Sequence, residues 1–212
     1  MKDIPFFTTQ FGVASLVFKQ IPYNGIAYVT IHDCADLQML LKECTDFCRA
    51  VGAAAVIATG NDGLSDYPLY TSVLKMRCSR EQLPDTDAKL FPVQAKTLAR
   101  FRDIYNEAMK HVCNASYMSY EDAEKVLSEG NGYFVHRDQV LLGIGIADGE
   151  RINAVVSLIQ GCGKDVLLAL NHALSGMCVE VEVASENTRA VRLYEKLGFV
   201  CCCELSKWYK IF

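Results

Sequence analysis

Two glycines and a lysine stand directly before a long apolar run in the second half of the chain. The segment reads Val155-Val-Ser-Leu-Ile-Gln-Gly-Cys-Gly-Lys-Asp165, and Val166–Leu174 follows it with a helical apolar pattern. Glycines let a backbone approach an anion closely, and the first amides of a helix have no partner within the helix. Lys164 adds positive charge. The pattern therefore indicates an anion site, although an ordinary strand–helix turn would carry the same glycines.

Asp165 is the residue that weakens this interpretation. A carboxylate in the first helical turn interacts favourably with the helix dipole, and it therefore competes with a bound anion for the same positive end. Two like charges about 4 Å apart repel by about 4 kcal/mol at an effective dielectric constant of 20. We expect Asp165 to weaken anion binding if its side chain points into the site, and to matter little if it points to solvent.

A second informative segment spans residues 179–199. Three valines, Val179, Val181 and Val183, alternate with Glu180 and Glu182, which predicts a strand with one apolar face. The helix that follows begins at an asparagine cap and ends at a glycine suited to the left-handed conformation. Its pattern residues are Asn187, Ala190, Leu193, Tyr194, Gly198 and Phe199.

Together these two segments resemble the acyl-CoA-binding core of the GNAT (GCN5-related) N-acetyltransferases. The second segment matches the family's Asn-x-x-Ala-x-x-Leu-Tyr-x-x-x-Gly-Phe at every position. The first matches Val-x-Pro-x-x-Arg/Gln-x-x-Gly-x-Gly/Ala, with Ser157 in place of proline and Asp165 in place of the final glycine or alanine. The alternative is an ordinary strand–helix unit of another α/β domain.

The resemblance implies acetyl transfer from acetyl-CoA to a primary amine, of a small molecule or a peptide, by direct attack. Tyr194 would serve the leaving thiolate, or else be a core aromatic residue. Glu182, or Glu180 on the same strand face, would activate the amine, unless both are merely solvated. The cofactor-binding residues implied by the resemblance are Val155, Val156, Ser157, Gln160, Gly161, Cys162, Gly163, Lys164, Asp165 and Asn187. A second hypothesis is a non-catalytic GNAT-derived module that binds acyl-CoA or a protein partner, as Asp165 suggests.

Composition narrows the class of protein. The 212 residues have a formal net charge of −4, so a nucleic-acid partner is not expected. No apolar run reaches the length of a membrane span, and the first residues lack the pattern of a signal peptide. The ten cysteines and four histidines show no metal-ligand spacing, so we expect reduced thiols, no metal and a cytoplasmic protein.

The chain is expected to divide at a polar, proline-containing linker over 79–92. Residues 93–212 would form the GNAT domain, an α+β fold with a mixed, mostly antiparallel sheet flanked by helices. Its predicted elements include strands at Val93–Lys96, Val200–Glu204 and Lys207–Phe212.

Residues 1–78 predict a strand hairpin, a helix over Asp36–Ala50, a buried strand at Ala53–Ala58 and a helix-like segment at Tyr67–Met76. This order repeats that of the second half but lacks a glycine-rich loop. The N-terminal part is therefore either a degenerate GNAT-like repeat or an unrelated α/β extension.

Overall fold

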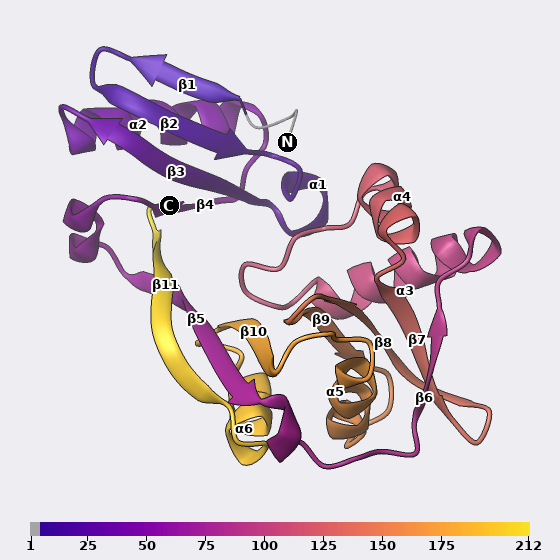
Figure 1. Ribbon diagram of the computed structural model, residues 1–212. Coiled ribbons are helices and arrows are strands. Elements are labelled where there is room, and N and C mark those ends of the chain that lie inside the picture. Colours follow the sequence, from indigo (N-terminus) through magenta and orange to yellow (C-terminus); the bar gives the residue numbers. More distant parts are fainter. Residues whose placement is uncertain (1–4) are drawn as a thin grey trace. The chain divides into compact units, whose positions relative to one another are not determined.

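The computed structural model describes residues 5–212, and the chain forms two units (Figure 1). The N-terminal unit holds the described residues up to Val73 together with Leu205–Phe212, and the C-terminal unit holds Leu74–Glu204. Two long strands, β5 (Leu69–Ser79) and β11 (Val200–Lys210), each contribute residues to both units.

The N-terminal unit is a sheet with one long helix on it. Strands β1 (Phe6–Thr9), β2 (Gly12–Val17) and β3 (Ile26–Cys34) run antiparallel, with the short helix α1 (Ile21–Asn24) between the last two. Strand β4 (Ala55–Thr59) is parallel to β3, and the end of β11 pairs antiparallel with β4. Helix α2 (Leu37–Ala50) packs its Leu and Cys side chains onto this sheet, and η1 (Asp62–Asp66) follows β4.

The C-terminal unit is a mixed sheet in the order β5-β10-β9-β8-β7-β6. Strands β6 (Lys89–Pro92), β7 (Gly132–Arg137), β8 (Val140–Asp148) and β9 (Arg151–Ser157) are antiparallel to one another, and β10 (Cys178–Ala184) is parallel to β9. Strands β7 and β8 form a hairpin around Asp138 and Gln139, and both of these residues have positive φ.

Helices cover both faces of this sheet. Helices α3 (Leu98–Met109) and α4 (Tyr120–Glu129) share one apolar cluster with Phe134, and α5 (Gly163–Asn171) and α6 (Thr188–Lys196) share another with Val135. Successive residues of a strand point to opposite faces, so the two clusters lie on opposite sides of the sheet. Two 3-10 turns, η2 (Arg80–Gln82) and η3 (Ala95–Thr97), complete the unit.

Helix α5 lies close against the sheet because β8 carries two glycines beneath it. A side chain at Gly145 would collide with Leu170, and one at Gly143 would come within 2.8 Å of Val166. This close approach places the start of α5 against the beginning of β8 and the end of β9, where the predicted anion loop lies.

Four sequence predictions differ from the structure. Tyr67–Met76 is a strand, not a helix: Met76 and Cys78 are buried while Lys75 and Arg77 are not, which is strand periodicity. No strand forms at Val93–Lys96, and the strand that precedes this position is β6. It lies inside the predicted linker, and Pro92 is tolerated because β6 is an edge strand.

The last two differences concern the end of the chain and the point of division. The two strands predicted at Val200–Glu204 and Lys207–Phe212 form one continuous strand, β11, which ends at Lys210, because no glycine or proline interrupts it. The two units divide at Val73, before the predicted linker, since β11 returns to the N-terminal unit. That the two halves are separate folding domains stays a prediction.

Candidate functional site

Strands β9 and β10 separate after a very short pairing. Each has seven residues, but only Arg151 and Ile152 pair with β10, opposite Glu180 and Val181. Further along, Val155, Val156 and Ser157 pair with β8 on one side. Within the described residues their other edge has no strand partner, so backbone groups there are available to an extended ligand.

In the N-terminal unit, the corresponding pair of parallel strands does not separate. There β3 and β4 form a parallel pair joined by a single helix, as β9 and β10 do, but all five residues of β4 are paired with β3. The start of α2 is also occupied, because the side chain of Asp36 accepts a hydrogen bond from the Met39 amide at 3.1 Å. Only the C-terminal unit therefore combines parted strands with an accessible helix start.

The predicted anion loop lies at this opening. Ser157 Oγ donates to the Ile159 carbonyl at 2.7 Å and the Cys162 amide donates to the same oxygen at 3.1 Å, which turns the chain back towards the sheet. Gly161 supports the turn with a φ of +92°. Cys162 precedes α5 without any side-chain hydrogen bond to cap the helix. The first amides of α5 are therefore left for another acceptor.

The side chain of Asp165 is directed to an arginine. Its Oδ1 lies 2.7 Å from Nη2 of Arg137, and Nε of the same arginine lies 2.6 Å from Oδ1 of Asp87. These two carboxylates raise the pKa of Arg137, Asp165 having the larger effect. Asp165 is thus neither loose in solvent nor unpaired at the helix start. Sequence reasoning missed Arg137 and Asp87, and the one available signal was that a carboxylate beside an anion loop needs a cation.

Helix α6 is built as the sequence predicts. Asn187 Oδ1 accepts from the Ala190 amide at 3.3 Å, Gly198 has a φ of +88°, and the Phe199 amide donates to the Tyr194 carbonyl at 3.0 Å. A side chain at Gly163 would come within 3.4 Å of Leu193. Leu193 of α6 therefore lies beside the start of α5, and a cofactor-binding role for the loop residues and Asn187 stays a prediction.

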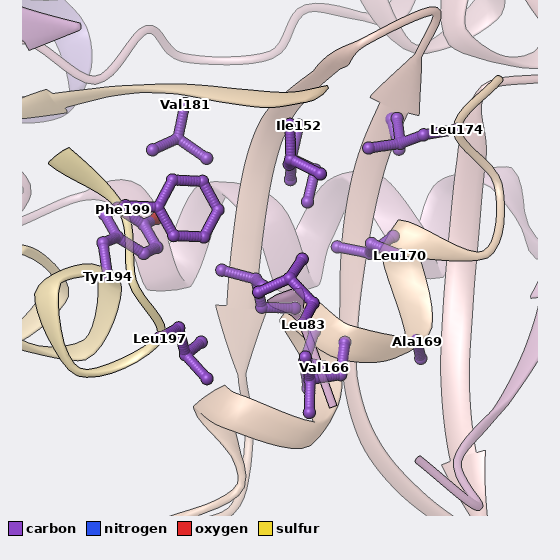
Figure 2. Packing of buried hydrophobic residues seen from close by; sticks show 14 of the residues in the cluster. Leu83, Ile152, Val166, Ala169, Leu170, Leu174, Val181, Tyr194, Leu197 and Phe199 are labelled. Carbon is purple, nitrogen blue, oxygen red and sulfur yellow. The ribbon is translucent and has the colours of Figure 1, made fainter. Parts of the chain in front are cut away.

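Tyr194 is a core residue at this site. Its ring is 7% exposed and its centroid is 5.6 Å from that of Phe199; Figure 2 shows the two rings side by side below Val181. Burial raises the pKa of Tyr194 to about 12, so the phenol is protonated at neutral pH. The interpretation of Tyr194 as a core aromatic thus holds for its ring, and a role for its hydroxyl stays a prediction.

The two candidate bases differ in their surroundings. Glu180 is 14% exposed and contacts three cations: Lys75 at 2.8 Å, Arg151 at 3.6 Å and Arg77 at 3.7 Å. The hydrogen bond from Lys75 is the largest cause that lowers the pKa of Glu180. Glu182 is 49% exposed and has one distant contact, Arg151 at 3.8 Å. Of the two, Glu182 is the carboxylate that a substrate could approach.

The cysteines and histidines form no metal centre in the part of the chain that the structure describes: no three His, Cys, Asp or Glu side chains lie close enough to hold an ion. All ten cysteines are free, and Cys44 and Cys48 are buried under the N-terminal sheet. Among residues 5–212, no helix has both the length and the apolar character needed to cross a membrane.

This arrangement of strands and helices also occurs in known proteins. No protein-family model and no curated protein sequence matches the chain. Among solved structures, a GCN5-related N-acetyltransferase from Sphaerobacter thermophilus has a TM-score of 0.59 at 12% identity, over 93% of this chain and 75% of that one. This chain has the GNAT fold. A conserved protein of unknown function from Staphylococcus epidermidis also has a TM-score of 0.59, at 10% identity over 99% and 94% of the two chains.

The GNAT fold also extends to the N-terminal half. A tandem GNAT protein from the clavulanic acid biosynthesis pathway has a TM-score of 0.50 at 13% identity, over 94% of this chain and 78% of that one. Because this match spans nearly the whole chain, it supports the GNAT-like repeat rather than an unrelated extension. In GNAT terms, β3–α2–β4 repeats β9–α5–β10, with its strands closed and its helix start capped.

Proposed function

We propose that the protein is an N-acetyltransferase that moves an acetyl group from acetyl-CoA to a primary amine by direct attack. The observation that carries the proposal is the separation of β9 from β10 next to the uncapped start of α5. An extended pantetheine arm fits the free edge of Val155–Ser157 as an added strand would. The amides and glycines of Gln160–Lys164 fit a pyrophosphate at a helix start, and the resemblance adds Asn187 to the cofactor-binding residues.

The amine must lose a proton before it attacks. A lysine-like amine with a pKa of about 10.4 is mostly charged at pH 7, which withholds about 4.6 kcal/mol of reactivity. We assign the removal of this proton to Glu182, directly or through a water molecule, because it is the exposed carboxylate of the pair on β10. The assignment leaves Glu180 a structural role among its three cations.

Tyr194 would act on the departing thiolate by donating a hydrogen bond. With a pKa of about 12 the phenol holds its proton far more tightly than a thiol, whose ordinary pKa is about 8.5. Complete transfer would therefore cost about 5 kcal/mol, and the proton that ends on the thiol must come from the amine or from water. Tyr194 in this role stabilises developing negative charge without itself ionising.

The alternative function is a non-catalytic module with the same fold that binds acyl-CoA or a protein partner. The acid in the anion loop and the burial of Tyr194 favour it. In that case the opening between β9 and β10 would bind coenzyme A without turnover, or would not bind it at all.

Two measurements separate these functions. Isothermal calorimetry with acetyl-CoA tests binding, and release of free thiol in the presence of a panel of small-molecule and peptide amines tests transfer. Binding with amine-dependent thiol release supports the acetyltransferase. Binding without release for any amine favours the module, and neither heat nor a rise in melting temperature at millimolar acetyl-CoA overturns both cofactor-based functions.

A further inference from the structure

We propose that Arg137 is a positioning residue for the cofactor site: by holding the side chain of Asp165, it keeps the start of α5 able to accept a phosphate. The inference rests on the proposed function and explains how this chain tolerates an acid in the anion loop. Arg137 ends β7 and reaches Asp165 in the first turn of α5.

Arg137 is held from two directions. Its Nε contacts Asp87 and its Nη2 contacts Asp165, so the planar guanidinium cannot turn away from either without losing a charge-assisted bond. The arginine side chain is 30% exposed and that of Asp165 is 25% exposed, whereas Asp87 is 72% exposed. The contact with Asp165 is therefore the more shielded of the two and the less weakened by salt.

The loop that carries Asp87 also contacts the end of α5. Asp85 Oδ1 lies 3.0 Å from Nε2 of His172, which ends α5, while Asp87 reaches Arg137 at the other end of the helix. Segment 83–88 thus runs along α5 with one acidic contact near each end. Asp85 and Asp87 are 90% and 72% exposed, so these two contacts add little rigidity, and Asp165 is the partner that holds Arg137 at the start of α5.

The consequence is electrostatic. An unpaired Asp165 would place a full negative charge in the first turn of α5, where it would repel a pyrophosphate. Paired with Arg137, the charge of the same carboxylate is offset at the helix start, while the second carboxylate on that arginine, Asp87, is 72% exposed and screened by solvent. Asp165 and Arg137 are therefore coupled, and loss of Arg137 should weaken anion binding more when Asp165 is present than when it is absent.

Four proteins test the inference: the natural protein, Arg137→Gln, Asp165→Asn and the double variant. The ligands are coenzyme A and pantetheine, which lacks the pyrophosphate. Arg137→Gln should weaken binding of coenzyme A about tenfold at low salt and less at high salt, and should leave pantetheine unchanged. Asp165→Asn should tighten coenzyme A about threefold, and the double variant should bind it as the natural protein does.

A failure of this inference can be distinguished from a failure of the proposed function. If the natural protein binds no coenzyme A, the proposed function is wrong. If it does, and Arg137→Gln binds coenzyme A equally well, or weakens both ligands alike, the inference is overturned. Should Arg137→Gln not fold, Arg137→Lys replaces it, because lysine keeps the charge but cannot contact both carboxylates in the same way. It should lose part of the affinity, and Asp165→Asn should restore that part; unchanged affinity would overturn the inference.

Discussion

The ammonium group of Lys75 lies 2.8 Å from the carboxylate of Glu180, on the strand face that also carries Glu182. This contact separates two glutamates that look equivalent in the sequence. Glu180 forms an ion pair that joins β10 to β5, whereas Glu182 remains half exposed beside the opening between β9 and β10.

The first prediction compares these glutamates. Glu182→Gln should lower kcat about 10²-fold or more, as expected for loss of a general base, with little effect on stability. Glu180→Gln should instead lower the free energy of unfolding by about 1 kcal/mol, because its cations lose their partner. Steady-state kinetics and urea unfolding of both variants provide the measurements. A larger loss of kcat in Glu180→Gln than in Glu182→Gln would reverse the assignment.

The Glu180 network should also appear in the pH dependence of stability. The pKa of Glu180 is lowered in the folded protein from an ordinary value of 4.5, so the unfolded chain binds more protons around that pH. Its contribution is therefore present above pH 4.5 and lost as the pH falls through the folded pKa. The stability difference between the natural protein and Glu180→Gln, followed by urea unfolding, should shrink on acidification and be constant near neutrality.

Tyr194→Phe should lower kcat by about 10²-fold while the affinity for acetyl-CoA stays nearly unchanged, because the ring still fills the core. Stability should also respond at high pH. Folding raises the pKa of Tyr194 from 10 to about 12, so the folded state keeps a proton that the unfolded state loses, and stability falls between these values. Tyr194→Phe should show a smaller fall over this range. An unaltered kcat would leave Tyr194 with its packing role alone.

Asn187→Ala should destabilise the protein by about 1 kcal/mol, because the Ala190 amide loses its acceptor at the start of α6. Asn187→Ser is the matched control, since serine is also a good cap and should retain most of the stability. Urea unfolding in the absence of any ligand measures both. Equal losses in the two variants would show that Asn187 acts through something other than capping.

Gly145→Ala should cost about 1–3 kcal/mol through overpacking, since the added methyl group would collide with Leu170 and lie 2.7 Å from the Ala154 carbonyl oxygen. Gly149→Ala is the comparison: it has open space around it and a φ of +59°, so it tests backbone strain alone, at about 1–2 kcal/mol. Because Gly145→Ala lifts α5 from β8, it should also weaken acetyl-CoA binding, whereas Gly149→Ala should not.

Local sequence patterns predicted those features whose conformation depends on neighbouring residues, such as helix ends and strand faces. Asn187 and Gly198 mark the ends of α6 because a cap and a left-handed residue act on the nearest turn. The valine–glutamate alternation predicted β10 and its two faces correctly. The GNAT fold followed from these short patterns, and the role of the loop before α5 as an anion site stays a prediction.

The sequence did not predict which distant segments of the chain pair with one another. β5 contains Tyr70, Thr71 and Val73, which favour strands, but the repeated order of elements predicted a helix there. The pairing of β5 with β10 makes it a strand. The ion pair of Arg137 with Asp165 joins the end of β7 to the start of α5, and no pattern in either segment indicates the other. Burial of Glu180 likewise depends on Lys75 and Arg77 from a distant strand.

The return of β11 to the N-terminal unit has a consequence for synthesis of the chain. Tyr209 and Lys210 pair with Ala58 and Ile57, and the Val56 amide donates to the Phe212 carbonyl at 3.1 Å, so β4 lacks one neighbour until residue 212 has left the ribosome. One edge of β4 therefore stays unpaired while the C-terminal unit is translated. An unpaired edge at β4 is a template for association with other nascent chains, and this protein should depend on chaperones more than its size suggests.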